Sequence, residues 1–168
     1  QTLSPTTIED YYKCPYRAFL SHSVKLKERE EGVVQAFSVG NLMHDIFSEY
    51  CVKLDEVRDE QSSSQLFNKI KEEVLKKEEY KKFLSDSVTS SAISRVLKEC
   101  EKYCFNTYCT LKNSSFSVET TEAQFGEGKF YPAVKLNGGK FKIKGKIDRV
   151  DVSDNYFRVL DYKTGTAD

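Results

Sequence analysis

The sequence predicts a mixed α/β (α+β) domain in which helices come first and a β-sheet follows. Over residues 1–112 the apolar side chains recur at the three- and four-residue spacing of amphipathic helices. Over residues 113–168 they alternate as in strands, and polar turn sequences interrupt the alternation. A chain of 168 residues can bury a real core, so we expect a single domain over residues 1–168.

The helical part divides into four predicted helices, at residues 4–20, 37–57, 66–83 and 92–111. Ser4 can cap the first helix and Pro5 suits its first turn, whereas Pro15 should kink or break it. Residues 59–64 are polar, which predicts a loop before the third helix.

The strand-rich part contains four predicted strands, at residues 116–125, 130–136, 140–152 and 156–162. Asn137-Gly138-Gly139 and Ser153-Asp154-Asn155 have the composition of hairpin turns, so an antiparallel meander is expected. The apolar positions change from odd to even across Asp148. This change predicts either a bulge or burial on both faces of the strand.

The composition limits the function only weakly. Lys+Arg and Asp+Glu are both 26, so any attraction to DNA must come from local patches or a metal. No apolar run approaches the ~20 residues of a membrane span, and no signal peptide is recognisable. Five cysteines without a secretory signal predict a reducing cytoplasm. The chain begins with Gln1 and ends at Asp168, and we expect both ends to be cuts through a larger protein.

Two carboxylates and one lysine lie near the end of the chain in a pattern that suits phosphodiester hydrolysis. Asp161 and Lys163 share one face of the last predicted strand, and Asp148 lies on the strand before it. Carboxylate oxygens hold Mg²⁺, and an ammonium group can stabilise a phosphate under attack. The alternative interpretation is an Asp–Lys pair on the exposed surface of a hairpin.

Two longer motifs around these residues resemble those of RecB-family PD-(D/E)xK nucleases. Residues 145–151, GKIDRVD, are similar to G-x-x-D-R-x-D, and residues 161–165, DYKTG, match the second motif of the family. The resemblance implies a restriction-endonuclease-like core with Mg²⁺ bound by Asp148 and Asp161, and with Lys163 as a further catalytic residue. Gly40 to His44 is similar to the family's G-x-x-x-H, which implies that His44 is a metal ligand in the site.

The segment YKCPYRAF at residues 12–19 resembles Y-x-x-C-P-Y/F-x-x-F of the B subunits of AddAB (RexAB) helicase–nucleases. The resemblance implies that Cys14 is the first ligand of a four-iron, four-sulfur cluster in the full-length protein. The other three ligands follow the nuclease motifs in that family. We therefore expect a C-terminally truncated fold without the cluster, because the positions of the other cysteines do not match, namely Cys51, Cys100, Cys104 and Cys109. Cys100 and Cys104 lie one helical turn apart and could chelate a metal, but we expect them to be packing residues.

The function that the resemblance implies is the exonuclease domain of a bacterial, cytoplasmic B subunit. That protein acts on DNA with an A subunit, and the pair processes double-strand breaks for recombinational repair. The complex uses ATP, which this chain should not bind because it has no Walker motif. We expect this piece alone to be inactive and to self-associate. An additional acidic ligand occurs in some such nucleases, but we expect Glu119 and Glu122 to face solvent or to pair.

Two other functions remain open from the sequence. One is a stand-alone iron–sulfur exonuclease of the CRISPR-adaptation type, which would share the nuclease motifs and the first cysteine. The other is a non-catalytic module that binds DNA or scaffolds a partner. The presence of His44, Asp148, Asp161 and Lys163 together argues against a module that has lost catalysis.

Overall fold

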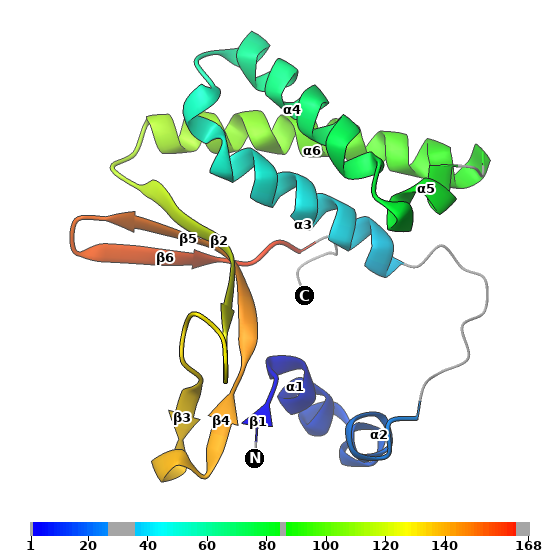
Figure 1. Cartoon of the computed structure of the whole chain (residues 1–168), viewed down its shortest axis with the longest axis vertical. Coiled ribbons are helices and arrows are strands. Elements are labelled where there is room, and N and C mark those ends of the chain that lie inside the picture. Colours follow the sequence, from blue (N-terminus) through cyan, green and yellow to red (C-terminus); the bar gives the residue numbers. More distant parts are fainter. Residues whose placement is uncertain (1, 27–35, 85–86, 164–168) are drawn as a thin grey trace. The chain divides into compact units, whose positions relative to one another are not determined.

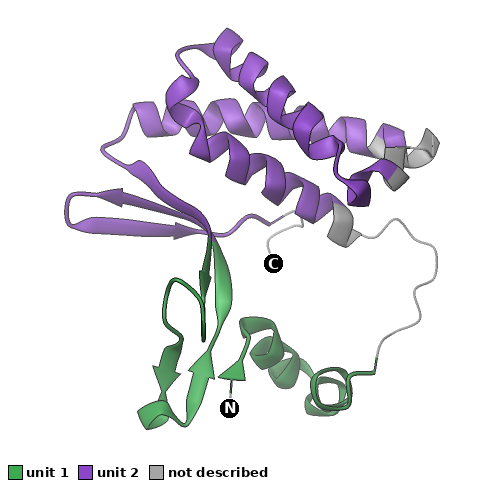
Figure 2. Ribbon diagram, viewed as in Figure 1, with its two compact units in different colours: residues 1–33, 123–147 green, residues 34–122, 148–168 purple. Residues whose placement is uncertain are grey.

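The computed structural model describes residues 2–26, 36–84 and 87–163, and Figure 1 shows their helices and strands. The chain divides into two compact units, residues 1–33 with 123–147, and residues 34–122 with 148–168 (Figure 2). The division falls within β2 (Ser117–Phe125) and within β5 (Gly145–Ser153). A single domain over the whole chain stays a prediction, and each unit is described by itself.

The larger unit is organised around a helical core. Its helices are α3 (Ala36–Val52), α4 (Glu60–Leu75), α5 (Glu78–Leu84) and α6 (Ser87–Lys112), and α3, α4 and α6 pack against one another (Figure 1). Their facing sides bury side chains that are at most 2% exposed, among them Ile46, Tyr50, Phe67, Ile70 and Cys100. Each such aliphatic or aromatic side chain stabilises the fold by about 1.5–3 kcal/mol.

The helix boundaries differ from the predicted ones where polar caps or turns intervene. The predicted loop at residues 59–64 is mostly helix, because Asp59 caps α4 by accepting the Ser62 N–H at 2.8 Å while Ser62 Oγ accepts the Asp59 N–H. The predicted helix 66–83 is two helices, α4 and α5, and the predicted helix 37–57 ends at Val52. After it a short 3₁₀ turn, η2 (Leu54–Glu56), brings Val57 into the core at 2% exposure.

The sheet beside these helices has the order β2-β5-β6. β5 and β6 (Tyr156–Leu160) are antiparallel, with Arg149 opposite Leu160 and Ser153 opposite Tyr156, which confirms the predicted two-strand hairpin and its turn. Within the larger unit, α3 contacts the sheet through Ser48, whose Oγ donates to Thr121 Oγ1 at 2.9 Å. The strand β6 ends two residues earlier than predicted, so residues 161–163 lie outside the sheet.

The smaller unit combines the first helices with a three-stranded sheet. Its helices are α1 (Pro5–Lys13), α2 (Pro15–Ala18) and the π-helical turn η1 (Phe19–Val24). The predicted cap and break are both confirmed, because Ser4 Oγ accepts the Thr7 N–H at 3.1 Å and Cys14 is extended between α1 and α2.

The sheet of this unit has the order β1-β4-β3, made of β1 (Thr2–Leu3), β4 (Phe141–Ile143) and β3 (Val134–Leu136). β1 is parallel to β4 and β3 is antiparallel to it, so the sheets are mixed rather than one meander. The turn η3 (Asn137–Gly139) joins β3 to β4, as predicted. The predicted strand 140–152 is divided at Lys144, whose N–H donates to Leu3 O. The predicted strand 130–136 shortens to β3, which starts after Pro132, a residue that cannot donate a backbone hydrogen bond.

The predicted order of helices before strands is confirmed apart from the short strand β1. Among the described residues, none of the helices combines the length and hydropathy that crossing a bilayer requires.

Candidate metal centre

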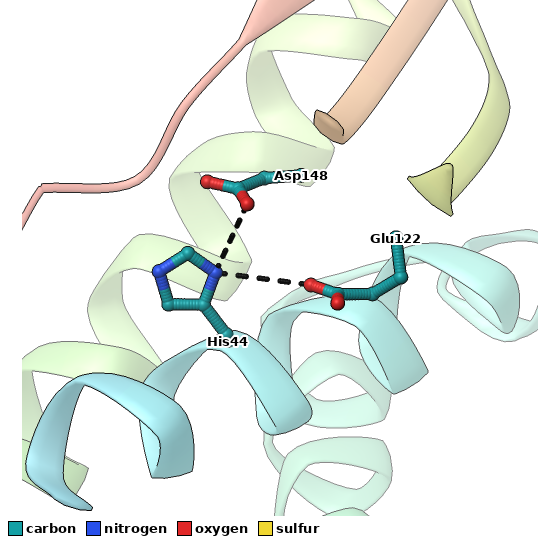
Figure 3. A group of neighbouring side chains, drawn as sticks. All are labelled: His44, Glu122 and Asp148. Carbon is teal, nitrogen blue, oxygen red and sulfur yellow. Dashed lines mark ion pairs between the residues drawn. The ribbon is translucent and has the colours of Figure 1, made fainter. Parts of the chain in front are cut away.

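Three side chains from three different elements of the larger unit converge on one point (Figure 3). They are His44 on α3, Glu122 on β2 and Asp148 on β5. His44 Nδ1 lies 3.3 Å from Asp148 Oδ1 and 3.7 Å from Glu122 Oε1. Two ligands held at about 2.1 Å from one cation are at most about 4.2 Å apart, so both distances fit a shared ion.

Asp148 is the most deeply buried of the three, with a side chain that is 6% exposed. Its Oδ2 accepts the backbone N–H of Tyr162 at 2.7 Å, and its Oδ1 faces His44. Burial continues at the next residue, since Asp148 and Arg149 are both buried. Of the two predicted alternatives, a bulge or burial on both faces of the strand, burial on both faces is therefore observed here.

Glu122 reaches the site through an unusual backbone conformation. It lies inside β2 with a φ of 53°, in the left-handed region that non-glycine residues seldom adopt. Such a residue interrupts the alternation of a strand and redirects its side chain, at a cost of about 1–3 kcal/mol. We expected Glu122 to face solvent or to pair, and its carboxylate pairs with His44 Nδ1. Glu119 is exposed, as expected. A positive φ at a glutamate leaves no signal in the sequence.

The donor atoms suit a divalent cation. His44 Nδ1 is buried, and among the described residues no hydrogen bond is made to it, although two carboxylate oxygens lie nearby. One imidazole nitrogen and two carboxylates are ligands that Mg²⁺ or Mn²⁺ accepts, and the imidazole also suits Zn²⁺. The residues present therefore fit a bound divalent metal ion.

Asp161 and Lys163 lie outside this group in the structure. The Asp161 carboxylate pairs with Lys163 Nζ at 2.8 Å, and the two side chains are 58% and 79% exposed. The β5–β6 register, continued by one residue, places Asp161 opposite Asp148. Their joint role in one active site stays a prediction, and residues 164–165 of the second motif lie outside the described residues.

A buried ion cluster lies behind the site in the larger unit. Asp151 is 0% exposed, and its carboxylate lies 2.9 Å from Arg149 Nε and 2.7 Å from Arg158 Nε. Arg149 Nη1 also donates to Cys51 Sγ and to the Tyr162 hydroxyl, both at 3.5 Å. Burial raises the pKa of the Tyr162 hydroxyl and that of the Cys51 thiol, so both groups stay protonated near neutral pH.

Cys14 belongs to the smaller unit and is exposed. It is the N-cap of α2, where its Sγ accepts the Arg17 N–H at 3.5 Å. Its predicted role as a cluster ligand stays a prediction. Cys100 and Cys104 are buried in the helical core, which confirms that they are packing residues.

A comparison with protein-family models matches residues 2–168 to the PD-(D/E)XK nuclease superfamily. The chain belongs to this superfamily. The mixed α+β architecture is consistent with the restriction-endonuclease-like fold of PD-(D/E)XK nucleases, as the motifs imply. Members of this superfamily typically use a divalent metal, which agrees with the group formed by His44, Glu122 and Asp148.

Curated relatives of this PD-(D/E)XK chain are named as the B subunit of an ATP-dependent helicase/deoxyribonuclease. The protein from Carboxydothermus hydrogenoformans is 31% identical over 182 residues, which is 99% of this chain and 16% of the relative. Those from Thermoanaerobacter sp. (strain X514) and Clostridium perfringens (strain SM101) are 29% and 27% identical over 98% of this chain. The chain thus spans 15–16% of the length of these relatives.

Proposed function

We propose that this chain is the DNA-cleaving exonuclease domain of a helicase–nuclease B subunit and that it uses Mg²⁺. The observation that carries the proposal is the convergence of His44, Glu122 and Asp148 around a buried imidazole nitrogen, in a chain of the PD-(D/E)XK superfamily. The reaction is hydrolysis of a phosphodiester, in which water attacks phosphorus and the bond to one ester oxygen breaks.

The three converging side chains bind and orient the cation in this proposal. A divalent cation in such a site neutralises charge on the phosphate and lowers the pKa of bound water. Asp148 contributes its Oδ1, because its Oδ2 is already held by the Tyr162 N–H. The His44 imidazole adds a neutral ligand, so the three converging side chains together contribute two negative charges.

In this proposal Lys163 contacts the phosphate or the attacking water, and Asp161 supports the cation. The Lys163 ammonium can leave its exposed pair with Asp161 for a phosphate oxygen or for the attacking water. An exposed ion pair of this kind is worth only about 0–1 kcal/mol, so its loss costs little when a phosphate arrives. Asp161 adds a carboxylate toward the cation from the position opposite Asp148.

The names of the relatives support a larger assembly as the setting of this activity. We propose that the longer protein works with an A subunit that supplies ATP-driven strand separation, and that the pair processes double-strand breaks for recombinational repair. We also propose that Cys14 contributes to an iron–sulfur cluster there. The relatives are named as part of a helicase/deoxyribonuclease, which favours this setting over a stand-alone exonuclease or a non-catalytic module.

Because we expect this piece alone to be inactive, the test uses the full-length B subunit with its A subunit and ATP. It measures cleavage of the strand assigned to this subunit in end-labelled DNA with Mg²⁺, with Mn²⁺ and with EDTA. We expect degradation with either metal and none with EDTA. The variant Asp148→Asn keeps the shape of the side chain but removes its charge, and we expect it to abolish cleavage.

The matched control is Asp154→Asn, the same chemical change at an exposed turn residue. Asp154 has a φ of 43°, a conformation that asparagine also tolerates, so the control should fold and cleave normally. Cleavage by Asp148→Asn at the wild-type rate, or undiminished cleavage in EDTA, would overturn the proposed function.

A further inference from the structure

The segment at residues 161–163 carries two proposed catalytic side chains but lies beyond the end of its strand. β6 ends at Leu160, and the side chains of Asp161 and Lys163 are mostly exposed. Tyr162 lies between them with the opposite orientation, half-buried against the helical core cluster. Tyr162 makes three kinds of contact that attach this segment to the rest of the larger unit.

The first of these contacts uses the backbone. The Tyr162 N–H donates to Asp148 Oδ2 at 2.7 Å, while Asp148 Oδ1 lies 3.3 Å from His44 Nδ1. Holding one oxygen of a carboxylate fixes the direction of the other. Hydrogen bonds to ligating carboxylates orient them for the metal in this way.

The second contact uses the aromatic ring. Its centroid lies 5.6 Å from that of the His44 imidazole with the planes at 67°, and 5.1 Å from that of Phe47 at 70°. Tyr103 adds a third edge-on contact at 5.7 Å. Such edge-to-face arrangements have a preferred geometry, so the Tyr162 ring restricts the rotation of the imidazole.

The third contact uses the hydroxyl group. It accepts from Arg149 Nη1 at 3.5 Å, and Cys51 Sγ lies 4.0 Å away. Arg149 is itself held by Asp151, which is completely buried. The hydroxyl is therefore attached to the ion cluster on the far side of the ring from Asp148.

We propose that Tyr162 is a positioning residue that orients two metal ligands, Asp148 and His44, and holds residues 161–163 beside them. The inference rests on the proposed function where it concerns cleavage, but its effect on metal binding is independent of any reaction. The backbone contact orients the Asp148 carboxylate, and the ring orients the His44 imidazole. The contact between the hydroxyl and Arg149 holds the ring in place.

The experiment measures Mn²⁺ binding to the protein by electron paramagnetic resonance without DNA. Tyr162→Leu removes the ring, and we expect it to weaken Mn²⁺ binding about tenfold or more, in the range typical for residues that orient metal ligands. Tyr162→Phe keeps the ring and should bind Mn²⁺ within about threefold of the wild type, since the hydroxyl contacts are long.

The matched control is Phe67→Leu, which removes a ring that is 2% exposed from the same core cluster. Phe67 lies on α4, a helix that carries none of the three ligands. We expect this variant to unfold more easily yet to bind Mn²⁺ within about threefold of the wild type. Equal weakening in Phe67→Leu and Tyr162→Leu would show a general effect of core damage and overturn the proposal.

A second measurement keeps the proposal testable if Tyr162→Leu does not fold. Amide hydrogen exchange in the metal-free wild-type protein should show the Tyr162 N–H protected, although it lies outside the sheet, because Asp148 accepts it. Exchange of this amide at the rate of an unprotected peptide of the same sequence would overturn the proposal. If the protein binds Mn²⁺ as expected but cleaves no DNA, the proposed function fails and the inference about Tyr162 stands. Conversely, normal cleavage together with unchanged Mn²⁺ binding in Tyr162→Leu would overturn the inference about Tyr162 and leave the proposed function standing.

Discussion

Asp148 and Asp161 occupy opposite positions when the β5–β6 register is continued by one residue, but the protein holds them by different means. Asp148 lies within β5, its side chain is 6% exposed, and it faces His44 across 3.3 Å. Asp161 follows the end of β6, its side chain is 58% exposed, and its carboxylate pairs with Lys163. Strand pairing and burial fix the first carboxylate, whereas the second depends on the neighbouring Tyr162.

This difference separates two parts of the proposed chemistry. A buried, pre-oriented carboxylate loses little conformational entropy when it binds a cation, so Asp148 should dominate metal affinity. An exposed carboxylate and ammonium can rearrange when a phosphate enters, so Asp161 and Lys163 should matter mainly for cleavage. Metal binding and cleavage should therefore respond differently to substitutions at the two positions.

The largest effect that we predict is on metal binding. Asp148→Asn should lose measurable Mn²⁺ binding up to millimolar concentrations, because the amide removes a charge from the centre of the ligand group. Asp161→Asn should keep Mn²⁺ affinity within about tenfold while cleavage falls at least a hundredfold. Paramagnetic resonance titration and a cleavage time course, on the same preparations, measure the two quantities.

The opposite pattern would break the comparison. If Asp161→Asn abolished Mn²⁺ binding as completely as Asp148→Asn, both carboxylates would bind the cation. The difference in their exposure would then not assign metal binding to Asp148 and cleavage to Asp161. The variant Asp154→Asn serves again as the charge-matched control, and it should change neither quantity.

The next largest effect concerns the anchor behind Tyr162. Asp151→Asn leaves two buried or half-buried guanidinium groups, those of Arg149 and Arg158, without their carboxylate. Removing one partner of a buried ion pair typically costs about 3–5 kcal/mol. We expect urea denaturation to show a loss of this size, against less than about 0.5 kcal/mol for Asp154→Asn at the surface. A loss of unfolding free energy below about 1 kcal/mol would mean that the Asp151 ion cluster contributes little stability and is a weak anchor for the Tyr162 hydroxyl.

The sequence was sufficient to predict much of this architecture. The cap at Ser4, the break at Pro15 and the hairpin turn after Ser153 follow from local backbone chemistry, which is why the structure agrees. The change of apolar phase at Asp148 predicted either a bulge or burial on both faces, and the structure has buried residues on both faces. The ends of the helices were less predictable. The end of α3 at Val52 allows Val57 to enter the core, and this tertiary contact leaves no pattern in the local sequence.

The candidate site was predictable only in part. His44 and Asp148 were assigned through family motifs, and they lie together in the structure. Glu122 was considered as an additional acidic ligand but was not placed in the site, because its position depends on a positive φ within a strand, which glutamate adopts only under tertiary constraint. The separation of Asp161 from the ligand group was also invisible, since a strand pattern does not state where hydrogen bonding to the neighbouring strand ends.

A smaller effect should distinguish Glu122 from its neighbour Glu119. Glu122→Gln keeps the side-chain length but removes the charge nearest to His44 after Asp148, and we expect Mn²⁺ affinity to fall about tenfold. Glu119→Gln is the matched control on the same strand, and its exposed side chain should leave affinity unchanged. Isothermal titration with Mn²⁺ measures both. Equal affinities for the two variants would remove Glu122 from the ligand group and leave Asp148 as its only carboxylate.

The smallest effect uses Cys51 to report how firmly Tyr162 holds its segment. Cys51 is 5% exposed, its Sγ lies beside Arg149 and the Tyr162 hydroxyl, and burial raises the pKa of its thiol. Alkylation at pH 8 therefore requires the segment to open, whereas the exposed Cys14 reacts directly. We expect Tyr162→Leu to accelerate alkylation of Cys51 several-fold and to leave that of Cys100, in the helical core, unchanged. Peptide mass spectrometry of a time course resolves the three thiols.

The pH dependence of the same thiol gives an independent check. Because burial raises the folded-state pKa of Cys51 above that of the unfolded chain, its contribution to stability is complete below about pH 8.5 and declines as the pH rises further. Cys51→Ala should therefore lose less unfolding free energy than the wild type between pH 8 and pH 10. If the two proteins lose the same amount, the thiol already ionises in the folded state. In that case the contacts around Tyr162 open too readily to position Asp161. Asp161 would then be held even less firmly, relative to Asp148, than the distances in the structure indicate.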